Sequence, residues 1–161
     1  PFFNKGPLFF RQERMGRHCL PFTAIKFRTI LCTPSVERTH ADPIETHRIT
    51  PLGQLLRRSR LDELPQILNV LKGDMSLIGP RPDYLPHAEE FVRTVPGYKH
   101  RHVVRPGISG LAQTEVGYAV GVEQTRRKVI ADLHYIRRTG YAMEFWIFWR
   151  TIRTVFGRHG C

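Results

Sequence analysis

The sequence predicts an α+β fold: a single helix-rich domain with a small β-hairpin and amphipathic helices suited to a membrane interface. Two observations lead to this prediction. Strand-forming residues gather near the N-terminus, whereas the rest of the chain alternates between helical periodicity and Gly/Pro turns. The chain has 161 residues, 41% of them hydrophobic, which suits one domain with its own core. We therefore treat residues 1–161 as one catalytic or binding domain.

The first predicted element is the hairpin. Residues 8–12 and 22–28 are rich in strand formers, and Gly16 lies in a turn-like segment between them. In the second strand, alternation places Lys26 and Arg28 on the same face, where the plainest interpretation is a solvated basic surface. Residues 33–47 are polar and contain two prolines, so they predict a loop.

Two helices should follow the loop, over residues 52–58 and 62–71. In the second helix Asp62 can serve as the N-cap, and Pro65 is tolerated in the first turn because its missing N–H has no helical partner there. Gly73 supplies the stop. One face of this helix carries only apolar residues, namely Leu64, Ile67, Leu68 and Leu71.

The C-terminal half predicts three further helices, over residues 86–94, 122–138 and 142–156. Before them, residues 79–82 read Gly-Pro-Arg-Pro, a stiff loop that fixes the direction of Arg81. In the last helix, apolar residues at 142, 145, 149, 152 and 156 form a stripe that predicts core packing. Trp146 and Phe148 fall outside the stripe, near arginines, which suits a helix at a membrane interface.

The net charge of +11 favours an anionic partner, which could be a nucleic acid, a phosphate-bearing substrate or an acidic membrane surface. No recognition helix, zinc finger or RNA-binding signature is visible, so no nucleic-acid partner is expected. The basic runs at 99–102 and 126–128 have two interpretations, a solvated face or a surface that binds anionic lipid or phosphate.

Asp62 and Glu63 are the strongest candidates for chemistry. A purely structural interpretation is an N-cap followed by an acidic first turn. A functional interpretation rests on the neighbouring cations, since Arg57 lies five residues before Asp62 and Arg81 lies on a proline-braced loop. Both arginines suit bidentate contacts with phosphate, and nearby cations favour the ionised form of a carboxylate.

Several short segments in a fixed order carry a resemblance over residues 6–156. They are Phe9-Phe10-Arg11-Gln12-Glu13-Arg14-Met15-Gly16, Lys26-Phe27-Arg28-Thr29, Arg48-Ile49-Thr50-Pro51-Leu52-Gly53, Leu61-Asp62-Glu63-Leu64-Pro65-Gln66, Asn69-Val70-Leu71-Lys72-Gly73-Asp74-Met75-Ser76, Gly79-Pro80-Arg81-Pro82 and Arg105-Pro106-Gly107-Ile108-Ser109-Gly110-Leu111. With these segments the chain resembles the bacterial sugar transferases, the small monotopic phosphoglycosyl transferases.

The resemblance implies transfer of a sugar 1-phosphate from a nucleotide-diphospho-sugar, usually a UDP-sugar, to polyprenol phosphate, with release of UMP. This reaction begins the assembly of exopolysaccharide, the O-antigen of lipopolysaccharide, or another glycan. By the same resemblance Asp62 is the nucleophile that forms a covalent aspartyl phosphosugar, and Glu63 helps to hold the cofactor Mg2+. Lys26, Arg57 and Arg81 match positions that the family uses around phosphate.

The resemblance also implies a location at the cytoplasmic face of the bacterial inner membrane, where an anionic membrane surface is a partner. A homo-oligomer, with a second copy of the chain as partner, is a further possibility. The family carries a hydrophobic re-entrant helix upstream of the first motif, and residues 1–161 do not include it. After Gly110 the segment at 114–121 departs from many relatives, so no particular sugar is predicted. The alternative function is a non-catalytic basic domain that binds a membrane surface or nucleic acid.

Overall fold

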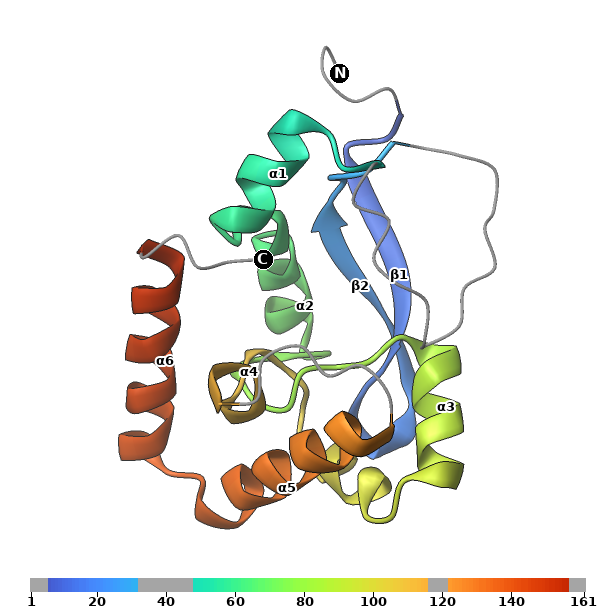
Figure 1. Ribbon diagram of the computed structural model, residues 1–161, viewed down its shortest axis with the longest axis vertical. Helices are drawn as coiled ribbons and strands as arrows, with labels where there is room; N and C mark the ends of the chain where they lie inside the picture. Colours follow the sequence, from blue (N-terminus) through green and yellow to red (C-terminus); the bar gives the residue numbers. More distant parts are fainter. Residues whose placement is uncertain (1–5, 32–47, 116–121, 157–161) are drawn as a thin grey trace.

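The computed structural model describes residues 6–31, 48–115 and 122–156, and it confirms the α+β class (Figure 1). The strands form an antiparallel hairpin, which has helices on two sides in Figure 1, and a short parallel pair. In chain order the elements, with η for a 3-10 helix, are β1 (Phe9–Met15), η1 (Arg17–Cys19), β2 (Pro21–Phe27), α1 (Pro51–Arg58), η3 (Leu61–Glu63), α2 (Gln66–Lys72), β3 (Ser76–Ile78), α3 (Leu85–Thr94), η4 (Tyr98–Val103), β4 (Gly107–Ser109), α4 (Leu111–Glu115), α5 (Val122–Arg138) and α6 (Tyr141–Phe156). The loop predicted at 33–47 lies outside the described residues.

The predicted hairpin is confirmed. Strands β1 and β2 pair antiparallel in a register that sets Phe9 opposite Phe27, and their rings stack with centroids 5.7 Å apart. The turn is tight at Gly16, where an added Cβ would lie 2.9 Å from the ring of Phe22. Strand β2 contacts η3 and α2, so the hairpin presents Lys26 to the turn that carries Glu63.

The parallel pair β3–β4 is an element that the sequence did not predict. Each strand has three residues, which is too short for an alternating pattern to be read. The two segments meet through glycines: a Cβ on Gly107 would lie 2.1 Å from the nitrogen of Gly79, and one on Gly110 would lie 2.2 Å from its oxygen. The crossing of the two backbones therefore requires glycine at these positions.

The helix predicted from residue 62 begins later, at Gln66, and Asp62 lies in the 3-10 turn η3 instead of at an N-cap. Pro65 has no N–H to donate to the carbonyl of Leu61, and the N–H of Leu64 occupies that carbonyl instead at 3.2 Å. This i to i−3 bond winds the chain tightly. The capping interpretation of Asp62 is therefore wrong, and its position is set by the turn.

Helix α2 turns its polar side inward. Gln66 and Asn69 are buried, whereas the predicted apolar face is exposed. The exposed fraction reaches 79% at Leu71, and the exposed members of this face are Leu64, Ile67, Leu68 and Leu71. The amphipathic pattern is thus real, but its apolar side does not belong to the protein core.

Helix α6 corrects a second prediction, because most of its apolar stripe does not pack in the core. Of that stripe, Phe145 is 68% exposed and Trp149 is 51% exposed. The helix packs instead through Ile147, which is fully buried, and Met143, which is partly buried, and neither belongs to the predicted stripe. The helix packs through a narrow seam that includes Thr151, whose hydroxyl lies 2.5 Å from that of Ser109 in β4. Within the described ranges, no helix combines the length and apolar character needed to cross a membrane.

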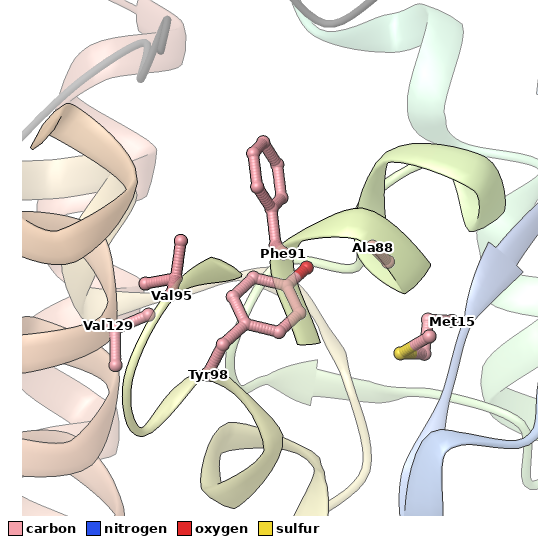
Figure 2. Packing of buried hydrophobic residues seen from close by; sticks show 6 residues of the cluster. All are labelled: Met15, Ala88, Phe91, Val95, Tyr98 and Val129. Carbon is pink, nitrogen blue, oxygen red and sulfur yellow. The ribbon is translucent and has the colours of Figure 1, made fainter. Parts of the chain in front are cut away.

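The main core joins the hairpin end to α3, η4 and α5 (Figure 2). Its buried members are Met15, Ala88, Phe91, Val95, Tyr98 and Val129. A second cluster packs α5 and α6 against β3 and α4, through Ile78, Leu111, Tyr135 and Ile147. Burying one such large side chain stabilises the fold by roughly 1.5–3 kcal/mol, so these clusters fix the elements that flank the candidate site.

The core residue Tyr98 borders a buried ion network, with hydrogen bonds to Asp83 and Arg101, that the basic runs did not reveal. Arg101 and Asp132 are almost completely buried and form an ion pair, and Lys128 binds Asp83. Two cations thus face two carboxylates in the protein interior. The interpretation of residues 99–102 and 126–128 as a solvated or lipid-binding face is therefore wrong for Arg101 and Lys128.

Candidate active site

The candidate site is centred on Glu63, at the end of the η3 turn. The Nζ atom of Lys26 lies 2.6 Å from its Oε1, and Arg81 binds both carboxylate oxygens, with its NH1 donating to Oε2 over 3.1 Å. Burial alone would raise the pKa of Glu63, but Arg81 and Lys26 outweigh it and hold that pKa well below its usual range. Glu63 therefore stays ionised and keeps two cations together.

Asp62, the neighbouring acid, is largely buried at 9% exposure, yet its carboxylate accepts no hydrogen bond within the described residues. Burial raises its pKa, an effect that Lys26 opposes together with Arg57 and Arg81. The sequence predicted that the neighbouring cations would favour the ionised form of Asp62, but burial outweighs them and the net shift of its pKa is upward. An unbonded carboxylate in a poorly solvated place retains its lone pairs for attack on an electrophile or for a cation.

The turn before Asp62 is strained. Arg60 adopts φ 56° and ψ 12°, in the left-handed region that favours glycine, and it connects α1 to η3. Its carbonyl accepts from the N–H of Glu63 over 3.2 Å. Strain of this kind persists only where the surroundings enforce it, and it occurs often at functional sites. Here it directs both acids toward the hairpin.

Arg57 reaches the site from the last turn of α1. The N-cap hydroxyl of Thr50 accepts from the N–H of Gly53 over 3.0 Å, and a Cβ on Gly53 would lie 2.0 Å from the carbonyl oxygen of Thr29. This approach sets α1 against the chain that leaves β2. Arg57 then donates from Nε to Oγ1 of Thr29 over 2.9 Å, and its terminal nitrogens have no hydrogen bond within the described residues.

The loop that carries Arg81 is held through its backbone. The N–H of Gly79 donates to the carbonyl of Ser109 over 2.8 Å, and the carbonyl of Pro80 accepts from Gly107 over 3.0 Å. Arg14 donates to the carbonyl of Pro82 over 2.6 Å. The predicted stiffness of this loop therefore comes from its neighbours as well as from its prolines.

The structure thus brings together all five residues that the sequence singled out. Three cations, Lys26, Arg57 and Arg81, surround two carboxylates, and each of the three influences the pKa of Asp62. The cluster carries an excess of positive charge, which favours an anionic substrate. Their individual chemical roles remain predictions.

Comparison with known proteins identifies the family of the chain. A family model described as bacterial sugar transferase matches residues 2–158. The chain belongs to this family. The match covers the segments that build the site, from β1 through α6.

Named relatives are similar over almost the whole chain. An Aeromonas hydrophila UDP-N-acetylgalactosamine-undecaprenyl-phosphate N-acetylgalactosaminephosphotransferase is 41% identical over 152 residues, which are 94% of this chain and 36% of the relative. A Caulobacter vibrioides UDP-glucose:undecaprenyl-phosphate glucose-1-phosphate transferase is 39% identical, covering 94% of this chain and 55% of that protein. A Bacillus subtilis uncharacterized sugar transferase, EpsL, is 40% identical, covering 96% and 73% respectively. The chain thus spans between a third and just over half of the first two relatives.

Family membership implies Mg2+ as a cofactor, and we therefore ask whether these residues offer the ligands that Mg2+ needs. Within the described part of the chain, no three His, Cys, Asp or Glu side chains gather as a metal site. Mg2+ often binds through one or two carboxylates and the phosphates of a substrate, and the unbonded carboxylate of Asp62 fits that requirement. Oε1 of Glu63 accepts from both Lys26 and Arg81, whereas Oε2 accepts from Arg81 alone, so Oε2 is the oxygen of Glu63 that keeps a lone pair for a metal.

Asn69 is a site-supporting residue that the sequence analysis did not single out. From the buried side of α2, its Nδ2 donates to the carbonyl of Thr23 over 2.7 Å and its Oδ1 accepts from the N–H of Ile25 over 3.1 Å. These bonds attach the helix that follows Asp62 to the strand that carries Lys26. An asparagine in a helix interior, where its propensity is poor, was the available signal.

Proposed function

We propose that this chain holds the catalytic site of an enzyme that transfers a sugar 1-phosphate from a UDP-sugar to polyprenol phosphate. The observation that carries the proposal is the carboxylate of Asp62, which accepts no hydrogen bond from the described residues and lies beside cations held in place by Glu63. The printed names of the relatives, which pair UDP-sugars with undecaprenyl phosphate, support the same reaction. Together they favour transfer through Asp62 over simple phosphate binding.

In the first step an oxygen of Asp62 attacks the β-phosphorus of the UDP-sugar. A phosphorus–oxygen bond to the carboxylate forms, and the bond between the β-phosphorus and the bridging oxygen breaks. UMP leaves with that oxygen and its electron pair, and the sugar phosphate remains on Asp62 as an acyl phosphate. Division into two steps makes each barrier lower than that of a single direct transfer.

In the second step an oxygen of polyprenol phosphate attacks the same phosphorus. The bond to Asp62 breaks, the carboxylate returns, and the product is a polyprenol diphosphosugar. Lys26, Arg57 and Arg81 offset the negative charge on the phosphates in both steps, because phosphoryl transfer depends mainly on positioning and charge neutralisation. Mg2+, when bound beside Asp62 with the substrate diphosphate, adds further charge neutralisation.

A lipid acceptor requires a site at a membrane surface, and two exposed regions suit one. The apolar face of α2 directly follows the acids, and α6 exposes Trp146 and Trp149, each with an arginine over its ring at 4.7 and 5.8 Å. With the net charge of +11, these features favour an anionic membrane. We place the protein at the cytoplasmic face of the bacterial inner membrane, where it begins exopolysaccharide, O-antigen or other glycan assembly.

The test supplies the purified protein in lipid nanodiscs with Mg2+, undecaprenyl phosphate and a panel of UDP-sugars, and measures UMP. We expect UMP from at least one sugar, and a labelled sugar phosphate covalently attached to the protein when the acceptor is omitted. Asp62→Asn should remove both signals. Glu89→Gln changes an exposed acid on α3, outside the site, and serves as the matched control.

Three results would contradict the proposal. Release of UMP at the parental rate by Asp62→Asn would exclude Asp62 as the nucleophile. Binding to liposomes without any UMP release would favour the alternative of a non-catalytic domain on an anionic membrane. Salt-sensitive retention on nucleic acid, again without UMP release, would favour the nucleic-acid alternative.

A further inference from the structure

The carbonyl of Arg81 is bound by a residue from a distant segment, Arg101 of η4. Its NH2 donates to that carbonyl over 2.7 Å. The side chain of Arg101 is fully buried, and Arg81 is the residue whose guanidinium binds Glu63 in the candidate site. A contact at the backbone of Arg81 therefore connects the interior of the protein to a cation of the site.

The remaining donors of Arg101 are fixed by two acids. Its Nε and NH2 lie 2.8 and 2.7 Å from Oδ2 of Asp132, and its NH1 lies 2.5 Å from Oδ2 of Asp83. Lys128 donates to the other oxygen of Asp83, so the charges balance. Burial opposes the charge on Arg101, but Asp132 and Asp83 outweigh it and raise its pKa. The guanidinium is thus charged, rigid and aimed at one carbonyl.

Asp83 makes the same loop part of the network. It follows Arg81 by two residues, and its carbonyl accepts from the N–H of Met15 over 3.1 Å, while Tyr98 donates its hydroxyl to Oδ2 over 2.7 Å. The loop is therefore held on both sides of residue 81. Buried ion pairs of this kind often add no net stability over well-packed apolar residues, so stability alone does not account for the arrangement.

We propose that Arg101 is a positioning residue for the transfer reaction, which it serves by holding the backbone of Arg81 so that its guanidinium meets Glu63 and the substrate phosphate. The inference rests on the proposed function, because it takes Arg81 as a phosphate-binding residue. A misplacement of about 1 Å in such a group can reduce turnover about 100-fold. Asp132 and Lys128, both on α5, keep Arg101 in place.

The first experiment compares Arg101→Lys with the parent and with Arg81→Ala, alone and combined. Lysine keeps the charge but cannot donate in several fixed directions at once. We expect Arg101→Lys to lower kcat about 10- to 100-fold with a smaller change in the KM for the UDP-sugar. If Arg101 acts through Arg81, its substitution has little further effect in the Arg81→Ala background. Lys99→Ala, an exposed neighbour in η4, is the control.

The second experiment separates positioning from stability. Arg101→Met combined with Asp132→Asn removes the buried charges in balance, so the fold should be retained while the donor to Arg81 is lost. We expect a parental melting temperature and a kcat as low as that of Arg101→Lys. The proposal would be overturned if Arg101→Met with Asp132→Asn had both a parental kcat and a parental stability. It would also be overturned if the effects of Arg101→Lys and Arg81→Ala on kcat were fully additive.

A measurement without turnover keeps this inference distinct from the proposed function. Hydrogen exchange at the amides of Met15 and Gly107, which bind the loop carbonyls, should be at least about tenfold faster in Arg101→Lys, while the Gln54 amide in α1 is unchanged. Unchanged exchange at the loop amides would overturn the positioning role. An inactive parent would contradict the proposed function, and the exchange result would still decide whether Arg101 holds the loop.

Discussion

The ammonium group of Lys26 and the carboxylate of Glu63 lie 2.6 Å apart, although 37 residues separate them in the chain. Burial and the nearby Arg81 lower the pKa of Lys26 to about 8, and Glu63 only partly opposes this shift. Lys26 therefore loses its charge within the range in which enzymes are assayed. This property leads to a pH dependence of both activity and stability.

For activity, we expect kcat/KM for the UDP-sugar to fall as the pH rises through about 8, because neutral Lys26 no longer attracts phosphate. Lys26→Arg keeps its charge at higher pH and should move this fall upward. A pH–rate profile of both proteins tests the prediction, with Lys99→Arg as the control. Identical profiles for the parent and Lys26→Arg would refute it.

For stability, the sign follows from the lowered pKa. The contribution of Lys26 is full above its unfolded pKa of about 10.5, and it is lost as the pH falls through about 8. The free energy of unfolding should thus increase as the pH rises from about 8 to about 10.5, and the increase should be smaller in Lys26→Met. Chemical denaturation at several pH values measures this difference.

Glu63→Ala should lower activity and weaken the dependence on Mg2+, if Glu63 serves as a metal ligand. It also leaves Lys26 and Arg81 without their shared carboxylate, so the free energy of unfolding should fall by about 3 kcal/mol at pH 7. Activity against Mg2+ concentration distinguishes the two roles. A lower kcat with an unchanged metal titration would leave Glu63 only as the anchor of the cations.

Gly53→Ala should destabilise the fold by about 2 kcal/mol or more and reduce activity, because the added Cβ would lie 2.0 Å from the carbonyl oxygen of Thr29. Helix α1 must then move, and Arg57 moves with it. Gly140→Ala is the matched control, since nothing lies within 4 Å of its added Cβ. Thermal unfolding and UMP release give the two readouts, and equal effects of the two substitutions would contradict the prediction.

Trp146→Ser combined with Trp149→Ser should weaken binding to anionic vesicles about tenfold, because both indoles are exposed on α6 and binding scales with the apolar area that enters the interface. Leu20→Ser removes an apolar residue at the hairpin turn that is more exposed than either indole, and it should have little effect. Vesicle sedimentation compares the three proteins. Parental binding of the double variant would exclude α6 from the membrane contact.

The hairpin and the helices could be predicted because their signals are local. Strand formers on either side of Gly16 and the glycine stop at residue 73 each concern a few neighbouring residues. The pairing of β3 with β4 could not, since it depends on the close approach of Gly79 to Gly107, which are far apart in the chain. The only sequence signal of this pairing is the glycines themselves, and glycine is equally common in ordinary turns.

The candidate site was predicted as a set of residues but not as an arrangement. Opposite charges near Asp62 and the braced Arg81 indicated a phosphate site, whereas the sharing of Glu63 by Lys26 and Arg81 depends on tertiary contacts. Arg101 was missed because a buried arginine and a solvated one look alike in a basic run. Its partner Asp132, an acid on the buried face of α5, was the available local signal of a buried ion pair.

The inward polar side of α2 has a consequence for any study of this protein in water. Its outward leucines offer about half or more of each side chain to the surroundings, and only lipid, detergent or another apolar surface can cover them. A second copy of the chain is one such surface. Particle size measured without an amphiphile will therefore depend on protein concentration, and a dimer found under those conditions reports leucine contact between molecules.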